Sequence, residues 1–356
     1  MARKHDNPRH EARERLFGAA KASLKYEGES GQDEDMVQES IKEELTPVTA
    51  NIVGDETLAE KPENQWVEMW RSLLANKAAT ISLFFILLIV LIAIFVPMFM
   101  PKTPTTEPVS SKIMLYNPTV TNMSAVRQGP NAKHWFGTDD LGMDIFSRVI
   151  AGARVSLSVG VIAVAIALAI GVTVGAVAGY AGGWLDTVLM RVMDMMLAVP
   201  SILLAITLMA VLGKGIDKAV IAISLVYVPE YARIVRSTIL SIKENDYVAA
   251  ARLTGDSQSR IIFRHVLPNT LSVIIVRATL GISGAILDTA ALGFLGMGVQ
   301  PPQAEWGAML GWARGYIFQC PWMLIFPGMA ITLSVLAFNL LGDGLRDAFD
   351  PKARVK

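Results

Sequence analysis

The chain has 356 residues, 52% of them hydrophobic, and its formal net charge at pH 7 is zero. Without a net positive charge, the composition gives no indication of nucleic acid as a partner. The single cysteine, Cys320, excludes an internal disulfide and a thiolate metal cluster. No two of the four histidines have the spacing of metal ligands. The mean hydropathy is +0.42, and the apolar residues gather in long uncharged blocks after residue 77.

Residues 1–65 form a polar segment with many acidic and basic side chains. They contain almost no aromatic residues, so they cannot bury enough apolar surface to offset the entropy lost on ordering. We predict a disordered cytoplasmic extension without a cleaved signal peptide. Residues 66–77 follow as an amphipathic stretch, which predicts a helix at the cytoplasmic membrane interface. Its apolar side chains have helical spacing: Trp66, Met69, Trp70, Leu73 and Leu74.

Residues 78–100 carry no charged side chain. As a helix they would extend about 34 Å, enough to cross a hydrocarbon core of about 30 Å. Similar apolar blocks predict five more spans, at residues 155–181, 193–213, 219–241, 271–298 and 317–342. The fourth span is the weakest, because it is interrupted by Pro229, Glu230, Arg233 and Arg236. We therefore predict an all-α integral membrane protein with six transmembrane helices that contacts the lipid bilayer.

The distribution of basic residues predicts how these spans are oriented. Six spans place both chain ends on one side of the membrane, and the Lys and Arg residues favour the cytoplasm as that side. The tail, residues 344–356, is then cytoplasmic. Residues 101–154, which are rich in Pro, Thr and Asn at first, form an extracytoplasmic segment.

The sequence lacks the common signatures of catalysis. It contains no G-x-x-x-x-G-K-[ST] loop for ATP phosphates, no G-x-S-x-G elbow, no H-E-x-x-H pair and no C-x-x-C motif. Its glycines lie mostly within apolar helices, where Gly171, Gly175 and Gly179 recur at every fourth position and favour close helix packing. We expect no catalytic residue, no metal and no cofactor in this chain.

Residues 243–268, between the fourth and fifth predicted spans, predict two short helices on the cytoplasmic side. Asn245 or Asp246 can cap the first helix, Gly255 can end it, and Pro268 helps to stop the second. A compact knob of this kind suits a groove in a partner protein, although the loop could instead fold back onto its own helices. The apolar faces of the two helices hold Tyr247, Val248 and Ala251, and Ile261, Ile262 and Val266.

This loop resembles the EAA loop in permease subunits of ATP-binding-cassette importers. That pattern is Glu-Ala-Ala, three residues, Gly, nine residues, and an apolar-x-Leu-Pro ending. Here Ala249 replaces Glu, which removes one polar contact with the ATPase, whereas docking depends mainly on shape. The resemblance implies an ATPase-coupling loop made of Glu244, Tyr247, Ala249, Ala250, Ala251, Gly255, Arg264, His265, Leu267 and Pro268.

Other stretches are similar to the permeases of the dipeptide, oligopeptide and nickel family. Residues 134–148 are similar to the start of their core domain, with Met143 in place of the usual Arg. Residues 292–302, followed by Trp306 and Gly307, are similar to their fifth-span signature. With Gly182 to Asp186 and Arg191, the resemblance extends over roughly residues 134–350.

The resemblance implies a six-helix type I importer bundle, with a permease core at residues 155–343, in a bacterial inner membrane. The expected partners are a second homologous permease, two ATPase subunits that bind ATP and Mg²⁺, and an extracytoplasmic substrate-binding protein. It favours peptides as substrates, with nickel or another small solute as the alternative in the same machine. Rival hypotheses from other classes are a self-sufficient ion-coupled transporter and a membrane scaffold without transport.

The fifth predicted span carries a polar stripe. Arg277, Gly281, Gly284 and Asp288 lie on one face of it, and ionisable groups at membrane depth generally face a bundle interior or a water-filled path. Gly281, Gly284 and Asp288 are therefore candidate path-lining residues. The alternative is that Asp288 bonds only to neighbouring groups.

Two further groups of charges lie near the predicted cytoplasmic side. Glu230, Arg233 and Arg236 have helical spacing, which predicts an ion pair among themselves at the interface. Asp186, Arg191 and Asp194 flank a predicted short cytoplasmic turn. We expect these residues either to order the turn or to touch the ATPase.

Overall fold

The computed structural model describes residues 65–100, 106–108, 115–257 and 260–349. Within these ranges the regular elements are helices, and the pairing of Thr138 with Asp144 is an isolated β-bridge. The predicted disordered extension, apart from Gln65, and the last residues of the predicted tail lie outside the described residues.

The first two helices are α3 (Gln65–Ala75) and α4 (Lys77–Phe99). Met69 and Leu73 of α3 are buried, whereas Trp70 is half-exposed, so the helix is two-sided as the sequence predicts. Asn76 separates the two helices, and its side chain accepts hydrogen bonds from the backbone N–H groups of Ala78 and Ala79 at 3.1 and 3.3 Å. Both helices agree with the predicted ranges to within two residues.

The next helix, α5 (Ile145–Ala181), is 37 residues long and begins ten residues before the predicted span. The helix thus starts within residues that the sequence assigns to the extracytoplasmic segment. Arg148 and Arg154 make this stretch look polar, but Arg148 is buried and its guanidinium donates to the carbonyl oxygen of Pro118 at 2.8 Å. The helix starts where the Asp144 side chain accepts a hydrogen bond from the Ser147 N–H at 2.8 Å.

The predicted third span, residues 193–213, is not one helix. The chain forms α6 (Gly183–Leu197) and α7 (Ser201–Leu212), which are bent by 92° at the break between them. Pro200 lies at this break, and a proline removes a backbone donor and clashes with the preceding turn of a helix. Twelve residues of α7 extend only about 18 Å, so α7 alone is too short to cross a bilayer.

The second half of the chain begins with α8 (Ile216–Lys243) and α9 (Asp246–Leu253). A π-helical turn, η3 (Ile261–Val266), then runs directly into α11 (Leu267–Phe294). Pro268 therefore does not stop the second loop helix; it lies in the first turn of α11, which continues from the π-helical turn. The chain continues through α12 (Trp306–Ala313), η4 (Arg314–Tyr316) and α13 (Trp322–Phe349).

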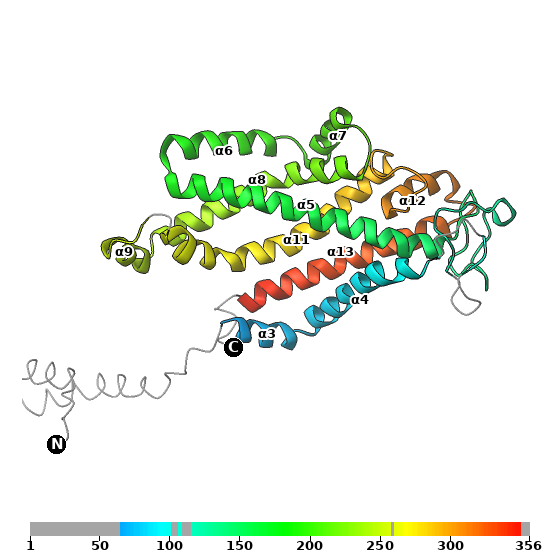
Figure 1. The fold of residues 1–356 in the computed structure, drawn as a ribbon, viewed down its shortest axis with the longest axis horizontal. Coiled ribbons are helices and arrows are strands. Elements are labelled where there is room, and N and C mark those ends of the chain that lie inside the picture. The colour runs from blue at the N-terminus through cyan, green and yellow to red at the C-terminus, as the bar shows by residue number, and fades with distance from the viewer. Residues whose placement is uncertain (1–64, 101–105, 109–114, 258–259, 350–356) are drawn as a thin grey trace, which may run out of the picture. The chain divides into compact units, whose positions relative to one another are not determined.

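In the described part of the chain, four helices are long and apolar enough to cross a membrane: α4, α5, α11 and α13. The bent pair α6 and α7 raises this number to five if it counts as one span. The remaining predicted span corresponds to α8, which has 28 residues but carries Glu230, Arg233 and Arg236 in its interior. Figure 1 shows α4, α5, α11 and α13 running side by side along the bundle.

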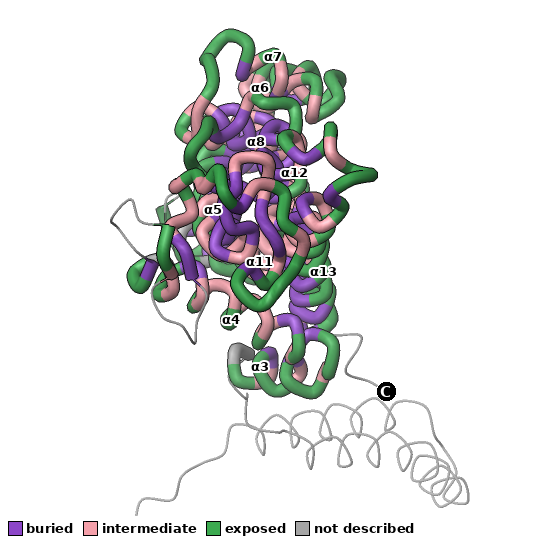
Figure 2. Tube along the Cα trace, turned by 90° about the vertical axis from the view of Figure 1, so that its right-hand side faces the viewer, coloured by how far each residue is buried: buried purple, intermediate pink, exposed green. Residues whose placement is uncertain are grey.

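The core of the unit from Trp66 onward lies where α5, α8 and α11 meet. Buried residues gather there in the end-on view of Figure 2, whereas α6 and α7 lie at the edge and are largely exposed. The approach of α5 to α8 depends on small residues, as the sequence predicts. A side chain at Gly175 would collide with the carbonyl oxygen of Ala232, and a Cβ at Gly171 would lie 2.7 Å from the Cβ of Tyr231.

Candidate functional site

The predicted coupling loop forms a short helix with one face on the bundle. Val248 is fully buried and Ala251 nearly so, one turn apart on the inner face of α9. They pack in a cluster with residues of α8 and of the π-helical turn: Val235, Ile239, Ile242, Ile261 and Val266. The apolar face that the sequence assigns to a partner's groove packs instead on the chain's own helices at Val248 and Ala251, which is the alternative that the sequence left open. The helix stands at the end of the bundle far from α12 (Figure 1).

The outer face of α9 is free of the rest of the described chain. Ala249, Ala250 and Leu253 share this face, and Leu253 is 90% exposed. Tyr247 lies beside them and is 43% exposed, so it does not share one face with Val248 and Ala251 as the sequence predicts. Two alanines between a tyrosine and a leucine give a shallow apolar surface, suited to packing against another protein.

The turn after α9 requires glycine. Gly255 has a φ of +86°, and a Cβ at this position would meet no atom within 4 Å. The N–H of Asp256 donates to the carbonyl oxygen of Ala251, and the N–H of Gly255 to that of Arg252, each at 3.1 Å. This is the hydrogen-bond pattern of a Schellman motif, so the left-handed backbone rather than lack of space selects glycine.

The other predicted residues of the loop lie around α9 and the start of α11. Glu244 and Arg264 are exposed, Leu267 is half-buried, and Pro268 is exposed in the first turn of α11. The side chain of His265 lies outside the described part of the structure.

Asn269 was not singled out by the sequence, but it joins α9 to α11. Its side-chain amide donates to the hydroxyl oxygen of Tyr247 at 3.2 Å. The only sequence signal for this contact is that Asn269 follows Pro268 at the start of a helix, which does not reveal a partner 22 residues away. Helix α9 is therefore attached to α8 by apolar packing and to α11 by packing and a hydrogen bond.

Ion pairs fix α6 against α8. Arg236 binds Asp186 through two N–O contacts of 2.5 and 2.6 Å, and Arg233 contacts Asp194 at 2.5 Å. The predicted ion pair within α8 was wrong, because each arginine points to an acid on a neighbouring helix. The stretch from Asp186 to Asp194, which the sequence predicts to be a short turn, is part of the helix α6. Sequence spacing shows which residues share a face, but not which helix packs there.

Polar side chains line the contact between α8 and α11, among them Tyr227, Tyr231 and Asp288, and we call this line the polar seam. The hydroxyl of Tyr227 donates to a carboxylate oxygen of Asp288 at 3.1 Å. A side chain at Gly284 would collide with the Tyr227 hydroxyl, and one at Gly281 with the hydroxyl of Tyr231. The two glycines of the predicted stripe thus make room for tyrosines of α8, which the sequence alone could not reveal.

The end of the bundle that carries α12 is organised around Asp144 at the start of α5. Besides its bond to the Ser147 N–H, the Asp144 carboxylate lies 2.9 Å from Nδ1 of His134. The ring of Tyr116 packs on the imidazole with centroids 4.7 Å apart, and the Tyr116 N–H donates to the Ser147 hydroxyl at 2.8 Å. Here the aspartate binds both the serine and the histidine. The three groups therefore form a structural hydrogen-bonded cluster, the Asp144 cluster, and not a proton relay from serine to histidine.

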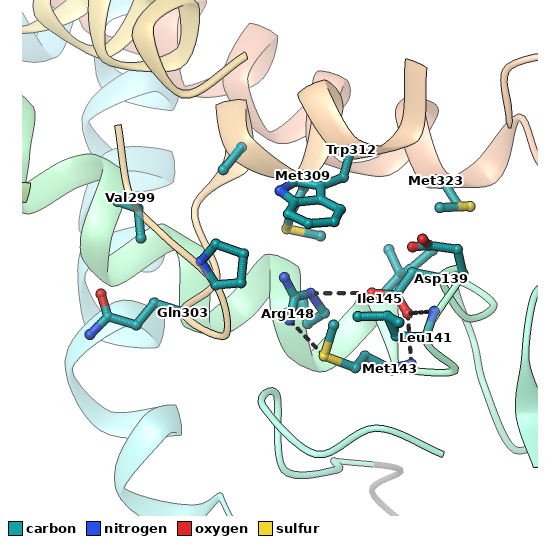
Figure 3. A pocket seen from close by; sticks show the side chains of 13 residues that line it. Asp139, Leu141, Met143, Ile145, Arg148, Val299, Gln303, Met309, Trp312 and Met323 are labelled. Atoms are coloured by element: carbon teal, nitrogen blue, oxygen red, sulfur yellow. Dashed lines mark hydrogen bonds and ion pairs between the residues drawn. The ribbon is translucent and has the colours of Figure 1, made fainter. Parts of the chain in front are cut away.

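A cavity of about 40 Å³ lies next to the Asp144 cluster, between the segment before α5 and helices α12 and α13 (Figure 3). Arg148 lies in its wall with Nε 3.7 Å from a carboxylate oxygen of Asp139. Burial raises the pKa of Asp139 above its ordinary value, although the guanidinium of Arg148 acts in the opposite direction. A second guanidinium nitrogen donates to the carbonyl oxygens of Pro118 and Pro302, so Arg148 holds three separate segments together.

Glu305 is a buried acid that the sequence did not indicate. Its carboxylate accepts hydrogen bonds from the N–H groups of Gly307 and Ala308 at 2.8 and 2.7 Å, which caps α12. The hydroxyl of Ser156 in α5 donates to it at 3.1 Å, and a side chain at Gly293 of α11 would collide with it. Burial raises the pKa of Glu305, and these hydrogen bonds oppose that shift. The residue ties α5, α11 and α12 together.

Residues 171–355 match the family described as binding-protein-dependent transport system inner membrane component. Residues 64–130 match the N-terminal TM domain of oligopeptide transport permease C. The dipeptide transport system permease protein DppC of Alkalihalophilus pseudofirmus is 52% identical over 234 residues, 66% of this chain and 77% of the relative. The di/tripeptide transport system permease protein DppC of Pseudomonas aeruginosa is 46% identical over 287 residues, 81% of this chain and 92% of the relative.

The glutathione transport system permease protein GsiD of Escherichia coli is 50% identical over 229 residues, 64% of this chain and 76% of the relative. A solved structure of the MetNI methionine ABC transporter in inward-facing conformations matches with a TM-score of 0.50 and 19% identity. The match covers 58% of this chain and 98% of that chain, and at this identity it shows the fold alone. The resemblance found in the sequence and the type I importer fold are thereby confirmed. The chain belongs to the family of binding-protein-dependent transport system inner membrane components, as a multi-pass inner-membrane permease of the DppC/OppC type.

Proposed function

We propose that the chain is the transmembrane subunit of an ATP-driven importer of di- and oligopeptides, and that it forms half of the translocation path. The exposed outer face of α9 is the observation that carries this proposal, because it offers a shallow apolar surface at one end of the helical bundle. The substrate class is supported by two relatives that are named for dipeptide and di/tripeptide transport.

The proposed partners are a second homologous permease, two ATPase subunits and an extracytoplasmic binding protein. The sequence carries no phosphate-binding loop, so ATP and Mg²⁺ bind to the ATPase subunits. In this arrangement α9 faces the cytoplasm together with both chain ends. The binding protein selects the peptide and releases it to the opposite side of the path.

The way in which α9 is attached supports a mechanical coupling. Apolar contacts with α8 and the Tyr247–Asn269 hydrogen bond with α11 keep α9 in place on two long helices of the bundle. When the ATPase pair closes on ATP, a helix held in this way transmits the displacement to α8 and α11. The helices then shift between inward-open and outward-open packings, whose populations depend on nucleotide.

Substitution of the outer face of α9 tests this proposal. The complex would be purified with Leu253→Glu or, as a control, Leu253→Met, and reconstituted into proteoliposomes with binding protein and trialanine. A charge on the exposed face costs the fold little, so the chain itself should remain folded. We expect Leu253→Glu to lose the ATPase subunits or ATP-driven uptake, whereas Leu253→Met retains both.

The rival functions give different results in the same preparation. A chain that purifies without ATPase subunits and transports along an ion gradient without ATP would be a self-sufficient transporter, and the proposal would be wrong. Ligand binding by the isolated binding protein separates peptide from nickel or another small solute. In the portions described by the structure, no group of three metal-ligating side chains lies close enough together to hold a metal ion.

A further inference from the structure

The polar seam between α8 and α11 contains ionisable side chains, which are costly to place against lipid. Asp288 lies in the interior of the spanning helix α11, six residues before its end, and is only partly buried. Glu230 and Arg277 are 48% and 49% exposed and lie 3.9 Å apart. Charged groups at membrane depth face either a protein neighbour or water. This face of the chain therefore borders a polar space or a partner.

The Asp288 carboxyl group has a hydrogen-bond donor but no basic partner among the described residues. Tyr227 donates a hydrogen bond to one of its oxygens at 3.1 Å, and Gly284 leaves the room that the tyrosine hydroxyl needs. Among the described residues, the ion pairs of the chain include no lysine, arginine or histidine at Asp288. A carboxylate inside a membrane helix that has one neutral donor and no counter-ion is a ready acceptor for a cation.

A second polar group on the same seam has no hydrogen-bond partner in the described part of the structure. This group is the buried hydroxyl of Tyr231. It lies against Gly281, one turn of α11 before Gly284, and its ring centroid is 6.4 Å from that of Tyr227. Buried polar groups are seldom left unpaired, because each costs free energy unless water or a ligand satisfies it.

We propose that Asp288, positioned by Tyr227, binds the primary ammonium group of a peptide as it passes along the translocation path. This inference rests on the proposed function, since it requires that the seam line the path. A peptide has an ammonium group at its N-terminus, and the interaction would be a charge-assisted hydrogen bond to the carboxylate. The residue thus selects for a free amine within the membrane part of the transporter, in addition to the selection made by the external binding protein.

The alternative is that Asp288 serves only as the hydrogen-bond partner that packs Tyr227. Two nearly isosteric substitutions separate the roles. Asp288→Asn removes the negative charge but keeps a side-chain oxygen that can accept from Tyr227. Tyr227→Phe removes the hydrogen bond but keeps the charge. Recognition of an ammonium group depends mostly on the charge, whereas packing depends on the bond.

The complete transporter, with both permeases, both ATPases and the binding protein saturated with trialanine, would be reconstituted into proteoliposomes. We expect Asp288→Asn to lower trialanine uptake per ATP hydrolysed by about 10- to 100-fold, the factor that corresponds to losing a hydrogen bond to a charged group. Tyr227→Phe should lose clearly less, and Asp288→Glu should restore most of the uptake. Ser283→Ala is the matched control, because it removes a 2.6 Å bond from the same helix to Asn339 of α13.

The outcomes separate this inference from the function on which it rests. Uptake by Asp288→Asn equal to that of the natural protein overturns ammonium binding, and so does an equal loss in Asp288→Asn and Tyr227→Phe. If the unmodified complex shows no ATP-driven uptake of trialanine, the proposed function itself is wrong. A loss confined to Asp288→Asn, with normal assembly and ATP hydrolysis, supports the inference.

Discussion

At the scale of single residues, Gly255 is one of the glycines whose positive φ disfavours any other residue. Its φ of +86° lies in the left-handed region, where a side chain costs about 1–2 kcal/mol, and Val adds the stiffness of a branched Cβ. We expect Gly255→Val to make the native turn about 5- to 30-fold less populated and to reduce peptide uptake per ATP accordingly.

The matched control for Gly255 is Gly315. A Cβ at Gly315 also meets no atom within 4 Å, but its φ is not in the left-handed region. Gly315→Val should therefore leave uptake and assembly unchanged. Equal effects at the two positions, measured by uptake and ATP hydrolysis in proteoliposomes, would mean that backbone conformation is not the reason for glycine at 255.

Glu305 should give the protein a pH-dependent stability. Burial raises the pKa of its carboxyl above the ordinary value of 4.5, so the folded state holds the proton more tightly than the unfolded state. The stability from this difference is present below pH 4.5 and is lost as the pH rises through the raised pKa. Glu305→Gln removes this titration. The melting temperature of the natural protein minus that of the variant should therefore decrease as the pH rises from acid to neutral.

Thermal unfolding of the purified complex in detergent at several pH values measures this difference. The exposed carboxylate of Glu244 provides the control, because Glu244→Gln removes a charge without changing a buried group. If the gap between the natural protein and Glu305→Gln stays constant with pH, the carboxyl of Glu305 does not titrate differently in the folded state.

At the scale of whole helices, the close approach of α5 and α8 depends on glycine. A Cβ at Gly175 would collide with the carbonyl oxygen of Ala232, so Gly175→Ala must push the two backbones apart. Overpacking of this kind costs about 1–3 kcal/mol. Gly328 of α13 is the comparison, because its Cβ would meet a single atom at 3.9 Å, an ordinary contact. Gly328→Ala should be neutral or stabilising, since alanine is the better helix former by about 1 kcal/mol.

The two glycine variants would be compared by thermal unfolding of the complex in detergent. A lower melting temperature for Gly175→Ala and an unchanged or higher one for Gly328→Ala are the expected results. Equal melting temperatures would show that α5 and α8 can separate without cost.

The helices also show which features can be read from a sequence. The hydropathy of residues 78–100 predicted α4 well, because an uncharged apolar run of this length has few alternatives. The same reasoning missed the start of α5, since Arg148 is charged yet buried, and hydropathy does not register its backbone partners. It also joined residues on both sides of Pro200 into one span, although the chain bends there by 92°.

For the candidate sites, the sequence predicted local features and missed contacts between helices. The positive φ of Gly255 and the burial of Val248 follow from the turn and the helical period. The pairing of Arg236 with Asp186, 50 residues away, does not. Local rules describe a residue and its neighbours within a turn or two. Which helices pack together depends on the shape of the whole bundle.

At the scale of the whole bundle, α11 connects the features described above. It continues from the π-helical turn beside α9, carries Asp288 in its interior, and packs against Glu305 through Gly293 near its end. In the proposed mechanism, a displacement of α9 would therefore act on the same helix that carries the proposed ammonium site. The Tyr247–Asn269 hydrogen bond is a polar link between α9 and this helix.

Breaking that link should weaken coupling without preventing ATP hydrolysis. Tyr247→Phe and Asn269→Ala each remove a hydrogen bond of about 1 kcal/mol, so we expect about a fivefold loss of uptake per ATP in each variant. Because both substitutions remove one shared interaction, the double variant should lose no more than either single variant. The ratio of trialanine taken up to ATP hydrolysed, in proteoliposomes, measures all three. Additive losses would mean that the two side chains act independently and that α9 drives α11 through its apolar contacts alone.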